Sequence, residues 1–489
     1  MKSIDPATLG LRALRASDLD ELGRRLGEGV LLADAERLSA YSHDETEALR
    51  FPPDLVLLPR DARQIEAILA YANQERLAVT PRGAGTGLSG GALPVCGGIV
   101  LGLERMNRIR EIDPRDLVAV AEAGVVTADL QRAVEERGLF YPPDPSSRES
   151  CQLGGNIAED AAGPRTVKYG STRRWVLGLE AVLANGSFIT TGSRTRKDAT
   201  GYALTQLLVG SEGTLAVITA ATLRLIARPR ATLTLILPFP ALESAARAVE
   251  RLFSEGFDPS ACEIAERAAL VAVGRLESLP RELLQAEAML LLELDGDDPE
   301  RLLGQAEAID RFASGLGAAP AIVADDAAGQ RRLWQIRRRV GEAVKQLSDY
   351  KEADAVVPRS QLAALVEAAR AAAARNGLTA ICYGHAGDGN LHVNLLRGEL
   401  SGGLWHERRD AAEDDLFRAV VALGGRISGE HGIGWTQRRF LPLAISPAEL
   451  AAHRALKAAL DPCGILNPGK IFPDPWISTS ITSSNGGGR

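Results

Sequence analysis

The sequence contains few cysteines and places them far apart. Its 489 residues include five cysteines, an odd number, and no two of them form a Cys-x-x-Cys pair. The spacing therefore gives no support for a disulfide framework, an iron–sulfur cluster or a cysteine-type zinc site. If the chain carries out redox chemistry, another protein or a small molecule must take the electrons onward.

The sequence also lacks a block of positive charge and long apolar runs. The net charge is −7 and no block of lysine or arginine dominates, which argues against nucleic acid as a partner. Residues 1–6 contain no apolar signal segment, and nowhere do about 18 apolar residues follow one another. We expect the protein to reside in the cytoplasm, with at most peripheral contact at the inner face of the membrane.

Glycine, in contrast, is concentrated in residues 81–92, directly after an apolar run. Five glycines within nine positions exclude a helix or a strand interior, and they let backbone N–H groups converge on a phosphate. Gly85, Gly87 and Gly90 fit the G-x-G-x-x-G pattern of NAD-binding folds. That pattern needs a helix after the loop, and the glycines and proline of residues 90–98 prevent one. A phosphate-binding loop of another architecture is thus favoured over a Rossmann fold or a plain glycine-rich turn.

Two later segments also combine glycines with neighbouring regular structure. Residues 141–158 contain several prolines followed by Gly154, Gly155 and Asn156 near a predicted helix start, and residues 208–218 lead into a predicted strand. Each segment alone could be a structural loop. Three such loops in one α+β domain suggest an extended dinucleotide that is contacted at several points.

The chain is longer than one hydrophobic core usually supports, so we expect two or three domains. For the first part, the apolar pattern predicts helices within 7–40, a β-α-β unit at 55–58, 62–73 and 77–80, strands at 98–103 and 117–123, and a helix at 126–137. For the second part, it predicts strands at 232–237, 261–266, 288–294 and 320–324, with helices at 241–253, 281–287 and 298–314. Two β-α-β halves of this kind form the ferredoxin-like pattern.

A further helix, predicted over residues 326–347, is rich in arginine. It carries Arg331, Arg332, Arg337, Arg338 and Arg339. A cationic helix is usually a solvated face, but such a run could also hold a carboxylate through a bidentate guanidinium group.

Histidine is rare, and half of the six histidines stand in two polar motifs flanked by glycines. In the first motif, His385 lies in a glycine-rich link between strands predicted at 379–382 and 391–396. On the second of these strands, His392 and Asn394 share one face, which we expect to face a site.

The second motif, residues 427–434, places Glu430 beside His431 between glycines. Two histidines and one carboxylate are a familiar ligand set for zinc or another divalent ion with an open position, and the remaining histidine could serve as a base. Any one of these histidines could instead be a hydrogen-bonded loop residue, but their concentration favours a function. His43, His406 and His453 stand apart, and we interpret them as structural.

Together these motifs resemble the FAD-linked oxidases of the vanillyl-alcohol oxidase/p-cresol methylhydroxylase superfamily. Within it the sequence is most similar to the D-2-hydroxyacid dehydrogenase branch, which includes D-lactate dehydrogenase, the FAD subunit of glycolate oxidase and D-2-hydroxyglutarate dehydrogenase. The resemblance extends over about residues 40–473 and rests on the segments 81–91, 154–156, 209–215, 384–392, 428–434 and 460–470.

The resemblance implies an α+β fold with four parts. Residues 1–228 would form an FAD-binding domain of two subdomains, and residues 229–425 an inserted ferredoxin-like cap domain that covers the flavin and binds substrate. Residues 426–475 would return to the FAD-binding domain and complete the active site. Residues 476–489 are expected to be a disordered tail.

By motif position, the resemblance also implies the roles of individual residues. His385, His392 and Glu430 would bind a divalent metal, either zinc or manganese, and His431 would be the catalytic base. Arg337 would meet the substrate carboxylate, and Asn394 the substrate's polar groups. The residues that would contact FAD are Arg82, Gly83, Ala84, Gly85, Thr86, Gly87, Ser146, Gly154, Gly155, Asn156, Gly163, Glu212, Gly213 and Ile218.

Three departures from the family pattern refine this expectation. Members that attach FAD covalently have a histidine in the glycine loop, and this loop has none, so FAD should be bound non-covalently. The family's common Asn-Ala-Gly-Gly segment reads Asp-Ala-Ala-Gly at residues 160–163. A substrate-binding threonine is replaced by Gly341, and the matching lysine, taken as the catalytic Lys351, is offset by one position. D-lactate or glycolate is therefore favoured over hydroxyglutarate.

The expected function is the FAD-dependent oxidation of a D-2-hydroxy acid to the 2-oxo acid. His431 would take the hydroxyl proton while the hydride passes to flavin N5, and the metal would polarise the substrate's oxygens. Electrons would then pass to a quinone, a cytochrome, an electron-transfer flavoprotein or an iron–sulfur partner subunit, and we expect a homodimer. Two alternatives stay open. A zinc hydrolase could use the same ligands but would not need three dinucleotide-like loops, and the intact Glu430–His431 pair argues against a non-catalytic FAD subunit.

Overall fold

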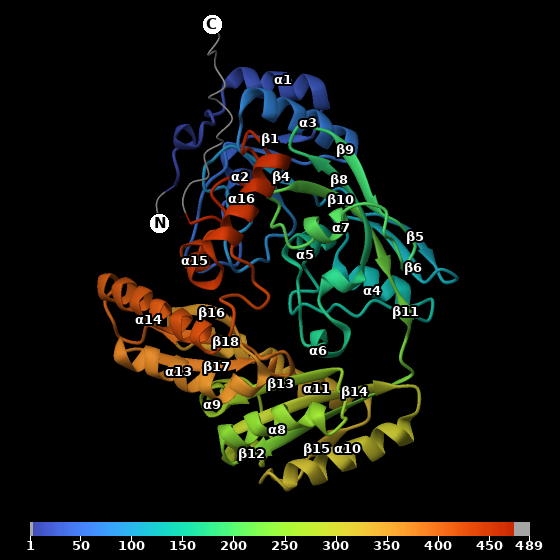
Figure 1. Ribbon diagram of the computed structural model, residues 1–489, viewed down its shortest axis with the longest axis vertical. Coiled ribbons are helices and arrows are strands. Elements are labelled where there is room, and N and C mark those ends of the chain that lie inside the picture. The colour runs from blue at the N-terminus through green and yellow to red at the C-terminus, as the bar shows by residue number, and fades with distance from the viewer. Residues whose placement is uncertain (1–2, 474–489) are drawn as a thin grey trace, which may run out of the picture.

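The computed structural model, described over residues 3–473, places most of its strands in three sheets (Figure 1). The first two sheets belong to the N-terminal half of the chain, and the third belongs to the part coloured from yellow-green to orange in the figure. Within the described range no helix has both the length and the apolar character needed to cross a lipid bilayer.

The first sheet delivers the glycine loop. Its strand order is β1-β2-β4-β3, in which β2 (Leu55–Leu57), β4 (Ile99–Gly102) and β3 (Val79–Arg82) are parallel. Helix α3 (Ala62–Glu75) connects β2 to β3 and buries its apolar stripe against the sheet, so the predicted β-α-β unit is confirmed. No helix follows β3 before β4, which confirms that the G-x-G-x-x-G match is not a Rossmann motif.

The chain before this sheet is less helical than predicted. It contains η1 (Pro6–Leu9), α1 (Ala16–Leu26) and α2 (Ala35–Ala40), but the short strand β1 (Leu31–Leu32) interrupts the predicted helical stretch. Leu31 and Leu32 pair antiparallel with Leu57 and Val56 at the edge of the sheet. Tertiary pairing thus overrides the local pattern here.

The second sheet is antiparallel throughout, in the order β5-β6-β10-β8-β9. Its strands are β5 (Ile109–Asp113), β6 (Val118–Glu122), β8 (Val176–Leu183), β9 (Phe188–Gly192) and β10 (Ala216–Arg224). Helices that share its core are α4 (Thr127–Glu135), α5 (Leu153–Glu159) and α7 (Leu204–Leu208). The short elements nearby are α6 (Thr166–Tyr169), η2 (Thr172–Trp175) and the ribbon of β7 (Leu139–Phe140) and β11 (Ile226–Ala227).

The third sheet is also antiparallel, in the order β15-β12-β14-β13-β17-β18-β16. Its strands are β12 (Ala231–Phe239), β13 (Ala261–Glu266), β14 (Ala288–Gly296), β15 (Ile322–Ala324), β16 (Tyr350–Val356), β17 (Thr379–Gly384) and β18 (Asn390–Leu396). The portion β15-β12-β14-β13 has the order of two interleaved β-α-β units. The remaining three strands extend the sheet beyond β13 and carry the histidine motif.

Helices cover both faces of the third sheet. Those that share the core of one face are α8 (Leu242–Ser254), α10 (Pro299–Ser314), α13 (Leu362–Arg375) and α14 (Gly402–Ala422). Those on the other face are α9 (Arg267–Val273), α11 (Ala327–Arg338) and α12 (Val340–Lys345). Single 3₁₀ turns are η3 (Leu283–Gln285), η4 (Arg359–Gln361) and η5 (Ala386–Asp388).

Two helix predictions in this part are wrong. The helix predicted over 281–287 is only the turn η3, whereas α9 follows β13 directly, with no glycine or proline to mark its start. The helix predicted over 326–347 is broken at Arg339, whose φ of −86° and ψ of −2° lie outside regular α-helical values.

The C-terminal segment leaves the third sheet and returns to the first. It contains η6 (Arg438–Phe440), α15 (Leu441–Ala444) and α16 (Pro447–Leu460), drawn in red beside the N-terminal half in Figure 1. Leu466 forms a parallel bridge with Val79, and the amide of Asn467 donates to the carbonyl of Val79 at 2.7 Å. The predicted boundaries after residues 228, 425 and 475 stay predictions, and the tail 476–489 lies outside the described residues.

Candidate functional site

A cavity of about 690 Å³ lies where the two halves of the chain meet. Its walls come from the glycine loop after β3, the segment that leads into α5, the start of β10, helices α11 and α12, and the loop at residues 428–434. The three glycine segments, which are far apart in the sequence, therefore open into one space that also reaches His392 and His431.

Nearly all of the predicted FAD contacts line this cavity. They are Arg82, Gly83, Ala84, Gly85, Thr86, Gly87, Ser146, Gly154, Gly155, Asn156, Glu212, Gly213 and Ile218. The exception is Gly163, which packs against the backbone of Asp144, where an added Cβ would lie within 2.4 Å of the carbonyl oxygen. Gly163 thus permits a close backbone approach behind the cavity wall.

The glycine loop presents unused hydrogen-bond donors to the cavity. Within residues 3–473, the amides from Gly85 to Leu88 donate to no other residue, and the buried Nη1 atom of Arg82 has no partner. Gly85 has a φ of 75°, and a side chain there would overlap the guanidinium group of Arg82. Converging N–H groups beside a guanidinium group fit a pyrophosphate, as an FAD-binding loop requires.

The predicted metal ligands converge at the other end of the cavity. His385 follows β17, His392 belongs to β18, and Glu430 lies in the loop 428–434. Glu430 Oε1 lies 3.2 Å from His385 Nε2 and 3.4 Å from His392 Nε2. One donor atom from each residue falls within 4.8 Å of the other two, which is the spacing of atoms that share one ion.

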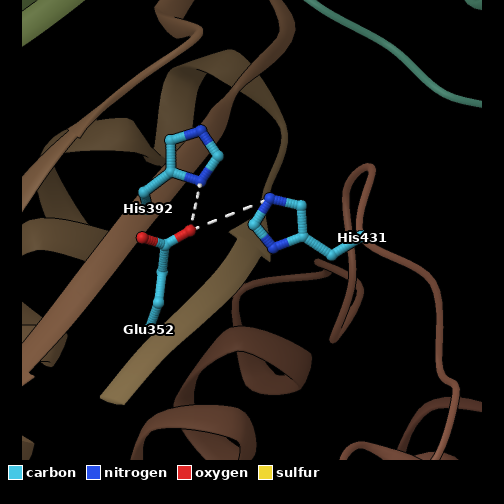
Figure 2. A group of neighbouring side chains, drawn as sticks. All are labelled: Glu352, His392 and His431. Carbon is cyan, nitrogen blue, oxygen red and sulfur yellow. Dashed lines mark ion pairs between the residues drawn. The ribbon is translucent and has the colours of Figure 1, made fainter. Parts of the chain in front are cut away.

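Each histidine of this set has a carboxylate at its other ring nitrogen. Glu263 Oε1 lies 2.8 Å from His385 Nδ1, and Glu352 Oε1 lies 3.5 Å from His392 Nδ1 (Figure 2). Such outer carboxylates are typical of metal-bound histidines because they fix the ring orientation. The donor set therefore fits a divalent ion such as zinc or manganese.

The charges of the cluster also fit a cation. Burial alone would raise the pKa of Glu430, but His385 and His392 outweigh burial and hold it well below the usual range. For His385, burial lowers the pKa, but the carboxylates of Glu263 and Glu430 raise it well above the usual value. Buried carboxylates thus dominate the cluster, and a divalent ion would balance them.

His431 lies beside this set with its ring facing the cavity. Its ring stacks on His392 with 5.2 Å between centroids and 18° between planes. Its Nε2 atom lies 3.8 Å from Glu352 Oε1, the same oxygen that faces His392 in Figure 2. Burial lowers the pKa of His431, but the surrounding carboxylates, Asp354 first, outweigh burial and raise it. The imidazole thus borders the cavity, and its raised pKa makes it a stronger base than a free imidazole.

Two buried carboxylates hold the loop that carries Glu430 and His431. Asp354 Oδ2 accepts hydrogen bonds from the amides of Gly429, Glu430 and His431 at 2.8, 2.7 and 2.8 Å, and from the hydroxyl of Ser428. Further along, the carboxylate of Glu212 accepts from the amides of residues 433 and 434. The glycine-rich loop is therefore fixed by side chains from both halves of the chain.

We predict that Asp354→Asn destabilises the fold by about 3 kcal/mol, because a neutral oxygen replaces the charge that these four donors share, and the new amide nitrogen would face the Asn390 side-chain nitrogen that donates to Asp354 Oδ1. Denaturant unfolding monitored by tryptophan fluorescence measures the change. Asp349→Asn is the matched control, because Asp349 is exposed and, within residues 3–473, its carboxylate forms an ion pair only with Arg397. A change in Asp354→Asn no larger than in this control would contradict the role of Asp354.

The structure brings some predicted catalytic residues to the cavity and not others. Arg337 lines the cavity, where its Nη2 atom pairs with Glu263 Oε2 at 2.7 Å. Asn394 is fully buried on β18 and does not line the cavity. Lys351 does not reach it either and pairs with Glu47 at 3.3 Å. Since neighbouring residues of a strand point to opposite faces, Glu352 takes the position on the cavity that Lys351 was expected to have.

Sequence reasoning missed the acidic residues that support the histidines. Glu263, Glu352 and Asp354 are single carboxylates in strands far from the histidine motifs, and none of them belongs to a recognisable motif. One signal was present: Glu352 and Asp354 alternate with the apolar Ala353 and Ala355, which indicates a strand with one polar face.

Models of two domain families match the chain. Residues 53–192 match the FAD binding domain, and residues 228–471 match the C-terminal domain of FAD linked oxidases. Together these matches span the glycine loop, the histidine motifs and most of the cavity.

Curated relatives match over nearly their full length. Glycolate oxidase subunit GlcD of Bacillus subtilis (strain 168) is 39% identical over 90% of this chain and 93% of its own. D-lactate dehydrogenase of Anaerostipes hadrus is 34% identical over 90% and 94%. D-2-hydroxyglutarate dehydrogenase of Stutzerimonas stutzeri (strain A1501) is 33% identical over 93% and 98%.

Among solved structures, p-cresol methylhydroxylase with bound substrate superposes with a TM-score of 0.76 over 96% of this chain and 99% of its own. The sequence identity is 16%, so this likeness shows the fold alone.

Proposed function

The chain belongs to the FAD-linked oxidases, and we propose that it oxidises a D-2-hydroxy acid to the 2-oxo acid, with D-lactate or glycolate favoured over D-2-hydroxyglutarate. The observation that carries the proposal is the meeting of His392, Glu430 and His431 with the glycine loop in one cavity. The names of three relatives that match over nearly their full length support it.

In this proposal the glycine loop binds FAD non-covalently. When bound, FAD supplies the acceptor for the hydride that leaves the substrate's C2 atom. The free amides from Gly85 to Leu88 and the guanidinium group of Arg82 would bind the pyrophosphate. Residues 154–156 and 212–218 would hold the rest of the molecule along the cavity.

A prediction for FAD binding follows from the room around Gly155. An added Cβ at Gly155 meets no atom within 4 Å, so Gly155→Leu should fold but fill the cavity. We expect the affinity for FAD to fall more than about 100-fold through steric exclusion, while the free energy of unfolding of the FAD-free protein changes by only about 1 kcal/mol. Flavin fluorescence titration measures the affinity. Gly304→Leu, in α10, is the control, since its Cβ also meets no atom within 4 Å. Equal FAD affinity of the two variants would contradict the assignment.

The second part of the proposal concerns a divalent metal held by His385, His392 and Glu430. When bound, the ion supplies Lewis acidity toward the hydroxyl and carboxylate oxygens of the substrate. Arg337 would bind the substrate carboxylate, and His431 would take the hydroxyl proton as C2 is oxidised. Asp354 would keep His431 in place through the backbone amide that it binds.

The two alternative functions are weaker. The family matches on both FAD-linked domains weigh against a zinc hydrolase. A non-catalytic FAD subunit would not need His431 beside the other histidines, and failure of every 2-hydroxy acid to reduce the bound flavin would favour it.

Product analysis tests the proposal. With an artificial electron-accepting dye, the protein should convert D-lactate to pyruvate, with one two-electron reduction of dye for each pyruvate formed. Dye reduction without the 2-oxo acid, or hydrolysis of ester substrates without any dye reduction, would contradict the proposal.

A further inference from the structure

Glu352 brings a negative charge to the cavity beside His431. Its side chain projects from β16 and is 10% exposed. As Figure 2 shows, Glu352 Oε1 faces both His392 and His431, at 3.5 and 3.8 Å. Among residues 3–473, no lysine or arginine forms an ion pair with Glu352. It is a cavity carboxylate beyond the three predicted metal ligands.

The wall around Glu352 leaves room for a substrate. Tyr383 lines the cavity, and its hydroxyl lies 3.5 Å from Glu352 Oε2. Gly341 of α12 faces this hydroxyl, and an added Cβ would come within 3.1 Å of it. Because Gly341 has no side chain, Tyr383 and Glu352 stay open to a group that extends from a ligand at His431.

Within residues 3–473, none of the lysines and arginines that line the same cavity forms an ion pair with Glu352. Arg337 is paired with Glu263. Lys345 lies over the ring of Tyr350, 5.7 Å from its centre, and Arg338 lies over the ring of Trp334, 5.4 Å from its centre. The charge of Glu352 is therefore directed at the cavity and the histidines.

We propose that Glu352 is a specificity-determining residue that restricts the reaction to 2-hydroxy acids with a single carboxylate. The inference rests on the proposed function, which puts the substrate hydroxyl at His431. A substituent on C2 of the substrate then lies close to Glu352, because the side chains of His431 and Glu352 are neighbours. A second carboxylate on that substituent meets a like charge whose side chain is only 10% exposed, whereas a short apolar or hydrogen-bond-donating group does not.

Two variants test this role. The ratio of kcat/KM for D-lactate to that for D-2-hydroxyglutarate is measured with the same dye for the FAD-loaded protein, for Glu352→Gln and for Glu352→Lys. We expect a ratio of at least about 100 in the unchanged protein, because like-charge contacts are strongly disfavoured. The ratio should fall about tenfold or more in Glu352→Gln and further in Glu352→Lys. Asp349→Asn removes an exposed carboxylate three residues earlier and should leave the ratio unchanged.

The outcomes separate this inference from the proposed function. If the unchanged protein oxidises both acids equally well, or if both variants lose activity on both acids by the same factor, Glu352 does not set specificity. An equal loss would instead indicate that it only positions His392 and His431. If no 2-hydroxy acid reduces the flavin of the unchanged protein, the proposed function itself fails. FAD and metal contents are measured for each variant. If Glu352→Lys loses FAD or the metal, the conclusion rests on Glu352→Gln, which keeps the side-chain shape.

Discussion

Replacing His431 by asparagine is expected to lower kcat on D-lactate about 10³-fold while FAD and metal contents stay unchanged. His431 lines the cavity and is the one imidazole of the site outside the proposed ligand set of His385, His392 and Glu430. Without a base, the hydroxyl proton has no acceptor as C2 is oxidised. Asparagine keeps the polar character of the side chain and the backbone amide that Asp354 binds.

Single-turnover reduction of the bound flavin by D-lactate is the appropriate measurement for His431→Asn, because it is independent of the electron acceptor. His406→Asn is the control, since His406 is exposed on α14. Full activity of His431→Asn would remove His431 from the mechanism and favour another base.

Removing the divalent ion with a chelator is expected to lower kcat about 100-fold or more and to leave FAD bound. The expectation rests on Glu430 Oε1, which lies 3.2 Å from His385 Nε2 and 3.4 Å from His392 Nε2. Added zinc or manganese should restore the activity, because each histidine is preoriented by an outer carboxylate.

A ligand variant provides the control for chelation. His385→Ala should have the activity of the chelated protein and should not recover with added metal, whereas His453→Ala, an exposed position on α16, should behave like the unchanged protein. Full activity at a metal content far below one ion per chain would contradict the metal assignment.

The parts of the fold that the sequence predicts correctly are those with local signals. The β2-α3-β3 unit and its glycine loop follow from an apolar run, an amphipathic helix and five glycines in nine positions. The rejection of a Rossmann motif succeeds for the same reason, because glycine and proline after Gly90 exclude a helix locally. The histidine motifs carry equally local patterns.

The parts that could not be predicted depend on contacts between distant segments. Glu263 of β13 and Asp354 of β16 support the histidine motifs only because the third sheet brings these strands together. The choice between Lys351 and Glu352 depends on strand register, in which one residue changes the face. The break at Arg339 is similar, since its side chain pairs with Glu277 from outside the helix.

Anaerobic mixing of the FAD-loaded protein with D-lactate and, separately, with L-lactate tests the central claim most directly. The account predicts that D-lactate bleaches the flavin absorbance within one turnover, that L-lactate does not, and that chelation slows the bleaching by D-lactate. Failure of every D-2-hydroxy acid to bleach the flavin, with FAD and metal both bound, would contradict it.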